Sequence, residues 1–195
     1  MTHLRSKVVP RPREFEPADP GYTSAMPITD LFRRISSAYS AGEQRPLRGY
    51  LATLCSYGAL VTGATVAGRR AGVRLPEQVS LSDVALLSLA THKASRLLTK
   101  AAVTSVLRAP FARFDGPAGP AEVNESVRGD GIRHAAGELV TCPFCSGVWI
   151  ATAFTAGLVF APRATRLAAT TLSAVAVSDW LHFADSKLKQ PAHND

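Results

Sequence analysis

Two uncharged stretches constrain the fold of this chain more than any other feature. Residues 49–68 and 143–161 contain no Asp, Glu, Lys or Arg. About twenty helical residues span the hydrocarbon core of a bilayer, so each stretch has the length of a transmembrane helix. Basic residues suited to membrane interfaces flank the first stretch, namely Arg45, Arg48, Arg69 and Arg70. The sequence therefore predicts a helical integral membrane protein.

Two further segments extend this prediction. Residues 167–184 contain a single acid, Asp179 near their end, with Trp180 and His182 beside it, and predict a third span. Residues 81–98 are interrupted by ionisable side chains that are costly against lipid: Asp83, His92, Lys93 and Arg96. Such a helix either turns its polar face into a bundle or lies in the interface, and the sequence leaves both options open.

The predicted fold class is all-α, a small transmembrane bundle of four membrane-associated helices in a membrane domain at 47–185. Residues 1–28 are rich in proline and charge and predict a disordered tail, and residues 29–46 predict a short amphipathic juxtamembrane helix. Residues 186–195 form a C-terminal tail. The alternative is a soluble Ala-rich helical domain. Small residues at four-residue spacing favour close helix packing in lipid instead: Ala59, Gly63, Ala67, Ala153, Gly157 and Ala161.

The basic residues predict orientation and partners. Lys and Arg number 22 against 15 Asp and Glu, and they lie between the apolar runs without interleaved exposed aromatics. This distribution favours the lipid bilayer over nucleic acid as a partner. With four crossings, more of the cations fall on the side of both termini and of the connection at 100–141. The positive-inside rule places that side in the cytoplasm. Other membrane proteins, or a second copy of the chain, are further candidate partners.

Cys142-Pro143-Phe144-Cys145 is the most specific local motif, and it lies where the uncharged stretch at 143–161 begins. A proline favours the first turn of a helix, and the helix amino terminus stabilises a thiolate. Three interpretations stay open: part of a zinc site, a dithiol redox centre, or two small side chains that pack at the start of a helix.

The zinc interpretation includes two more residues. If residues 132–142 are helical, His134, Glu138 and Cys142 share one face, and Cys145 supplies a fourth ligand. The alternative is that His134 and Glu138 form a solvated face of a cytoplasmic helix. The sequence specifies no other cofactor.

Ionisable residues in the membrane segments are a second group of candidates: Asp83, His92, Arg96 and Asp179. Such residues at membrane depth are functional hypotheses by default. The alternative is that Arg96 or His92 pairs with Asp179 and fixes the packing of the bundle.

These motifs carry a family resemblance. The segments concerned are Leu81-Ser82-Asp83, Ala90-Thr91-His92-Lys93, Ser95-Arg96-Leu97-Leu98, Leu107-Arg108-Ala109-Pro110-Phe111, Gly137 to Cys145, and Ser178-Asp179. The chain resembles an uncharacterised bacterial multi-pass membrane family, domain-of-unknown-function family 1360, over about Arg48 to Asp185. The resemblance implies a place in the bacterial inner or plasma membrane. It implies no reaction, substrate or catalytic residue.

The function predicted from the sequence is a structural or interaction role in the membrane. The sequence favours such a role over an enzymatic one. Neither a phosphate-binding loop nor a Ser nucleophile elbow is present in the sequence. The first alternative is a metal-binding or thiol-redox membrane enzyme or sensor centred on Cys142 and Cys145. The second is a small transporter that uses the polar face of residues 81–98.

Overall fold

The structure, a computed structural model, describes residues 27–40 and 45–189. It divides into two units, Met1–Arg45 and Pro46–Asp195. In the first unit, α1 (Ile28–Ser40) starts one residue before the predicted juxtamembrane helix at 29–46, and its Asp30 and Arg33 lie 3.4 Å apart. Residues 1–26 of the predicted disordered tail and residues 190–195 lie outside the described residues.

Four long helices belong to the second unit: α2 (Leu47–Arg70), α3 (Leu81–Thr99), α6 (Pro143–Phe160) and α7 (Pro162–Leu188). Of the helices described, α2 and α6 are long and apolar enough to cross a membrane, and they coincide with the predicted spans at 49–68 and 143–161. The predicted segments at 81–98 and 167–184 are helical within α3 and α7, which are 19 and 27 residues long, but neither helix contains an equally apolar stretch of spanning length.

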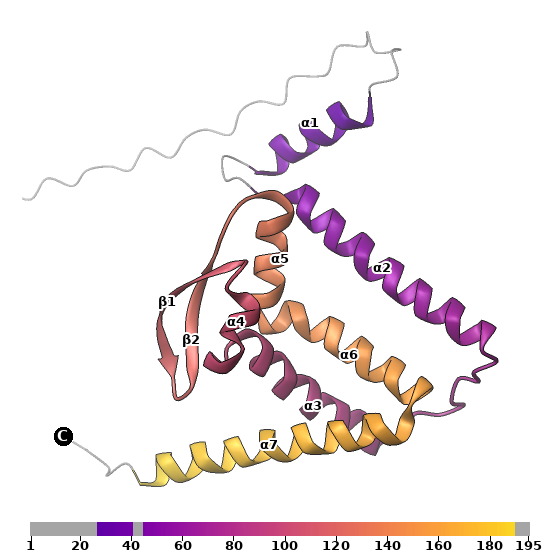
Figure 1. Cartoon of the computed structure of the whole chain (residues 1–195), viewed down its shortest axis with the longest axis vertical. Coiled ribbons are helices and arrows are strands. Elements are labelled where there is room, and N and C mark those ends of the chain that lie inside the picture. Colours follow the sequence, from indigo (N-terminus) through magenta and orange to yellow (C-terminus); the bar gives the residue numbers. More distant parts are fainter. Residues whose placement is uncertain (1–26, 41–44, 190–195) are drawn as a thin grey trace, which may run out of the picture. The chain divides into compact units, whose positions relative to one another are not determined.

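The helices α2 and α6 run in the same direction beside each other (Figure 1). Midway along them, the hydroxyl groups of Tyr57 and Thr152 lie 2.7 Å apart, and the rings of Tyr57 and Trp149 meet edge to face. At their C-terminal ends, Gly68 lies against the ring of Phe160. Along both helices these contacts come in the same order, with Tyr57 before Gly68 on α2 and Thr152 before Phe160 on α6. The two helices are therefore parallel.

The other two long helices run in the opposite direction. A single residue, Ala161, separates α6 from α7, and α7 turns back so that Thr165 packs against Gly157. Beside α7, α3 runs in the same direction. Asp83 pairs with Arg166 near the start of both helices, and Lys93 pairs with Asp179 further along both. Between these pairs, Ser173 donates a hydrogen bond of 2.8 Å to the carbonyl oxygen of Leu86. The four helices therefore alternate in direction along the chain. Residues 71–80 and the α6–α7 turn lie at one end, which we call the turn end.

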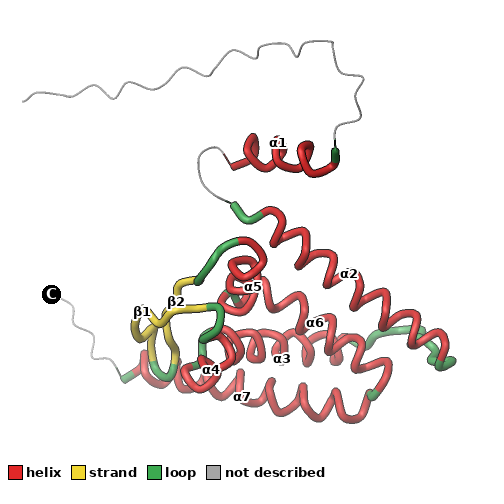
Figure 2. Tube along the Cα trace, turned by 45° about the horizontal axis from the view of Figure 1, so that its top comes forward, coloured by secondary structure: helices red, strands yellow, loops and turns green. Residues whose placement is uncertain are grey.

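Residues 100–141 lie at the opposite end and form a folded cap (Figure 2). The cap contains η1 (Ala102–Thr104), α4 (Ser105–Arg108), β1 (Ala112–Gly119), β2 (Glu122–Val127) and α5 (Gly131–Thr141). Because β1 and β2 pair antiparallel, the all-α prediction needs correction: the chain is mostly helical with a two-stranded sheet.

Local sequence patterns did not predict this sheet. In β1, Pro117 and two glycines interrupt the usual strand pattern, and the register shifts on both sides of Pro117. Proline is tolerated in strands at edges and irregularities, and here tertiary pairing overrides weak local preference.

Two glycines allow the close helix contacts that small residues were predicted to provide. A Cβ added at Gly49 would lie 2.4 Å from the carbonyl oxygen of Gly131, so α2 touches the backbone of α5 there. A Cβ added at Gly157 would lie 2.5 Å from the hydroxyl of Thr165. By contrast, an added Cβ at Gly63 would meet nothing within 4 Å. The predicted row of small residues on α6 therefore contacts a neighbouring helix at Gly157. The predicted row on α2 faces outward at Gly63.

Candidate functional site

The helix break at Cys142 positions the cysteine motif. Proline has no N–H, and its ring disfavours a helical backbone at the preceding residue. Cys142 is accordingly extended, with φ −103° and ψ 114°, so α5 ends at Thr141 and α6 begins at Pro143. The motif lies where the cap meets the first turn of α6. The local sequence therefore determines both the break and the place of the two thiols.

The Cys142 sulfur caps the amino terminus of α6. It accepts a hydrogen bond from the backbone N–H of Cys145 at 3.4 Å, and neither cysteine forms a disulfide. Burial raises the pKa of Cys142. Hydrogen bonds from the Cys145 thiol and from the N–H groups of Cys145 and Phe144, with the positive charge of Lys100, outweigh burial and bring this pKa below its ordinary value. Of the two thiols, Cys142 is therefore the one that ionises more readily.

The other two predicted ligands form a separate pair. His134 and Glu138 share one face of α5, as predicted, with 3.5 Å between Nε2 and Oε1. The Nδ1 atom of His134 also lies 3.1 Å from the carbonyl oxygen of Gly129. Cys142 follows the end of α5 and leaves its helical path. Within residues 27–40 and 45–189, no three His, Cys, Asp or Glu side chains gather as they would around a metal ion.

The predicted intramembrane residues Asp83 and Asp179 join α3 to α7. Two hydrogen bonds of 2.8 and 2.9 Å link Arg166 to Asp83 at the turn end. Further along, Asp179 pairs with Lys93. Both acids therefore have a basic partner on the neighbouring helix.

Neither of the remaining two candidates, Arg96 and His92, forms the alternative ion pair with Asp179. Arg96 binds both carboxylate oxygens of Glu122 on β2, at 2.6 and 2.8 Å from Nη2. The His92 ring lies 6.2 Å from that of Trp180 on α7. Arg96 therefore joins α3 to the cap instead of fixing the bundle.

Sequence reasoning missed a buried arginine whose hydrogen-bond donors are all satisfied. The side chains of Arg108 and Glu125 are 0% and 5% exposed and form an ion pair. All five N–H groups of Arg108 have acceptors: both oxygens of Glu125, the Thr104 hydroxyl, and the carbonyl oxygens of Leu98 and Ala101. Arg108 thus ties the end of α3 to η1 and β2. The only signal was its place in the Leu107-to-Phe111 segment.

The family comparison covers this same part of the molecule. The family model described as "Protein of unknown function (DUF1360)" matches residues 86–185, just over half of the 195 residues. The chain belongs to the DUF1360 family. No curated protein and no solved structure matches it. The DUF1360 match starts well after Arg48, so α2 and the segment Leu81-Ser82-Asp83 lie outside it.

The matched DUF1360 range contains most of α3, the whole cap, α6 and most of α7. It therefore includes the Arg108–Glu125 and Arg96–Glu122 pairs and both cysteines. The DUF1360 part of the chain is thus an α-helical hairpin, α6 and α7, packed on α3 and joined to it by the cap.

Proposed function

We propose that this DUF1360 protein is an integral membrane protein with a structural or interaction role, whose four long helices cross the bilayer and whose cap faces the cytoplasm. The outward-facing apolar surface of α2 and α6 carries the proposal. Only 6% of the most apolar 18-residue window of either helix is buried. Leu54, Leu60 and Phe144 are 67%, 63% and 88% exposed. A core helix of a water-soluble protein buries such residues, whereas lipid solvates them.

The ion pairs support crossing by α3 and α7 as well. Charged side chains inside a membrane are costly unless they face the bundle and are paired. The partners Asp83 and Arg166, and likewise Lys93 and Asp179, join these two helices side to side. The same pairs favour a structural role, because they use these groups for helix packing.

The distribution of basic residues supports the orientation. The cap end carries Arg48, Lys100, Arg108, Arg113, Arg128, Arg133, Lys187 and Lys189. The turn end carries Arg69, Arg70, Arg74, Arg163 and Arg166. The excess at the cap end matches the cytoplasmic side under the positive-inside rule.

Cysteine accessibility tests this proposal. In a background with serine at the three native cysteines, Glu77→Cys places one thiol at the turn end and Ala118→Cys places one in the cap. With intact bacteria, a membrane-impermeant maleimide should label only Glu77→Cys. Ala118→Cys should react after the membrane is permeabilised.

Two results would contradict the proposal. Recovery of the protein in the soluble fraction would rule out membrane insertion. Equal labelling of both variants in intact cells would rule out a membrane between the turn end and the cap. Membrane abundance of each variant, measured by immunoblot, serves as the control.

The geometry at Cys142 favours a second candidate function, a dithiol reaction. The Cys142 thiolate would attack a small-molecule disulfide and release one thiol. Cys145 would then displace the second thiol and close a Cys142–Cys145 disulfide, so the pair is oxidised as the substrate is reduced. In a Cys55→Ser background at pH 7, Cys145→Ser should leave a thiol that reacts faster with an aromatic disulfide reagent than the thiol left by Cys142→Ser. Equal rates would exclude a selectively activated Cys142.

A further inference from the structure

Two cavities flank one row of residues on α6. The first, about 430 Å³, lies between α2 and α6, and Val73 and Leu75 line it at the turn end. The second, about 340 Å³, lies between α3 and α6. Both are lined by Ala151, Thr155 and Val159, which follow each other at four-residue spacing along α6. Each cavity has the volume of a small-molecule pocket.

The lining leaves few polar groups for a ligand. The hydroxyls of Thr65, Thr152 and Thr155 each donate to a carbonyl oxygen of their own helix, four residues earlier. On the α3 side, Ser88 does the same. Because these hydroxyls are satisfied within their helices, the walls favour an apolar occupant.

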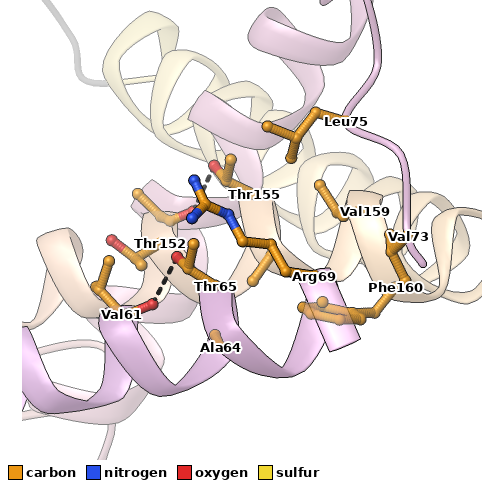
Figure 3. Close-up of a pocket in the computed structure, with 13 residues that line it drawn as sticks. Val61, Ala64, Thr65, Arg69, Val73, Leu75, Thr152, Thr155, Val159 and Phe160 are labelled. Carbon is orange, nitrogen blue, oxygen red and sulfur yellow. Dashed lines mark hydrogen bonds between the residues drawn. The ribbon is translucent and has the colours of Figure 1, made fainter. Parts of the chain in front are cut away.

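Arg69 is the charged residue of the first cavity. In Figure 3 its side chain reaches from α2 across the cavity, and the guanidinium lies among the labelled lining residues. No ion pair between Arg69 and any residue in the described ranges is present, and the same holds for Arg70, Arg74 and Arg163 at this end. A guanidinium at the edge of an apolar cavity suits an acidic head group with phosphate or carboxylate oxygens.

We propose that these cavities hold an anionic phospholipid, with one acyl chain on each side of the Ala151–Thr155–Val159 row and the head group at Arg69. Paired cavities on one helix row match two chains, and the cation at the turn end matches the acidic group that joins them. The site lies at the level where the turn end would meet the lipid head groups. This inference rests on the proposed membrane insertion.

Lipid binding to the purified full chain in detergent tests the proposal, with phosphatidylglycerol and phosphatidylcholine as probes and native mass spectrometry as the readout. Phosphatidylglycerol should bind about fivefold more tightly, from one cationic contact. Arg69→Gln should abolish this preference. Arg70→Gln, which removes the same charge from a residue outside the lining, should keep it.

A second matched pair of variants tests the sites proposed for the two acyl chains. Ala151→Leu fills the row shared by both cavities and should weaken binding of both lipids by roughly tenfold. Ala153→Leu makes the same change on an exposed residue of α6 that lines neither cavity and should have no effect. Inorganic phosphate and glycerol phosphate should not compete, because they lack acyl chains.

Distinct outcomes separate this proposal from the one on which it rests. Two results obtained with membrane-inserted protein would overturn the lipid site alone. One is phosphatidylglycerol binding that Ala151→Leu leaves unchanged. The other is an equal effect of Arg69→Gln and Arg70→Gln on this binding. A dimer in wild-type protein that Ala151→Leu disrupts, without lipid binding, would assign the row to a second copy instead. Soluble protein would overturn the membrane proposal itself.

Discussion

At the scale of single residues, Arg108 shows how a buried charge can be retained. Moving a guanidinium out of water costs several kcal/mol unless a counter-ion and hydrogen bonds compensate. Glu125 supplies the counter-ion, and the carbonyl oxygens of Leu98 and Ala101 use donors that would otherwise be unsatisfied. Because Leu98 lies in the last turn of α3 and Ala101 follows just after it, the same side chain also caps the C-terminal end of that helix. Arg108 therefore connects local structure to the assembly of the cap.

Arg108→Met should destabilise the protein by about 3–5 kcal/mol, because it leaves the Glu125 carboxylate buried without a partner. Thermal unfolding in detergent, followed by circular dichroism, would measure the loss. The double variant Arg108→Met/Glu125→Gln should recover part of it. Arg113→Met, at an exposed arginine of β1, is the control and should unfold like the wild type. A melting temperature for Arg108→Met equal to that of the control would exclude this role.

At the scale of elements, the glycines decide which helices touch. Gly49 brings α2 against the backbone of α5, and Gly157 brings α7 against α6. Gly63 and Gly58 on α2 have no neighbour within 4 Å of an added Cβ. The same residue type thus serves packing at some positions and leaves an open surface at others. Sequence spacing alone does not separate the two cases.

Gly49→Ala should destabilise the contact between α2 and α5, because its Cβ would lie 2.4 Å from the carbonyl oxygen of Gly131 and 2.7 Å from the Cβ of Ala135. Overpacking of this kind typically costs about 1–3 kcal/mol. Gly63→Ala in the same helix is the matched control and should be neutral or stabilise by up to about 1 kcal/mol through helix propensity. The melting temperatures of the two variants in detergent test this, and equal values would contradict the predicted contact.

At the scale of the whole second unit, direction and charge act together. The alternating long helices place residues 71–80 and the α6–α7 turn at one end, and the cap at the other. The cap holds α2 through Gly49, α3 through Arg108 and Arg96, and α6 through the break at Cys142. One folded element thus contacts three of the four long helices.

The sequence by itself determined the features that depend on local chemistry. The uncharged stretches specified α2 and α6, since about twenty apolar residues are needed to cross lipid. The proline at Pro143 specified the helix break, and the spacing placed His134 and Glu138 on one face of α5. The family membership was also visible in the motifs, and a family model confirms it over residues 86–185.

Tertiary structure alone decided the features that depend on partners distant in the sequence. The strand β1 has weak local propensity and forms because β2 pairs with it. Lys93, and not Arg96 or His92, is the partner of Asp179, because the direction and rotation of α7 on α3 select the facing residue. Arg108 needed Glu125 and the end of α3 to become a buried centre. The uncharged stretches therefore predicted which helices could enter a membrane, and long-range contacts decided how the cap joins them.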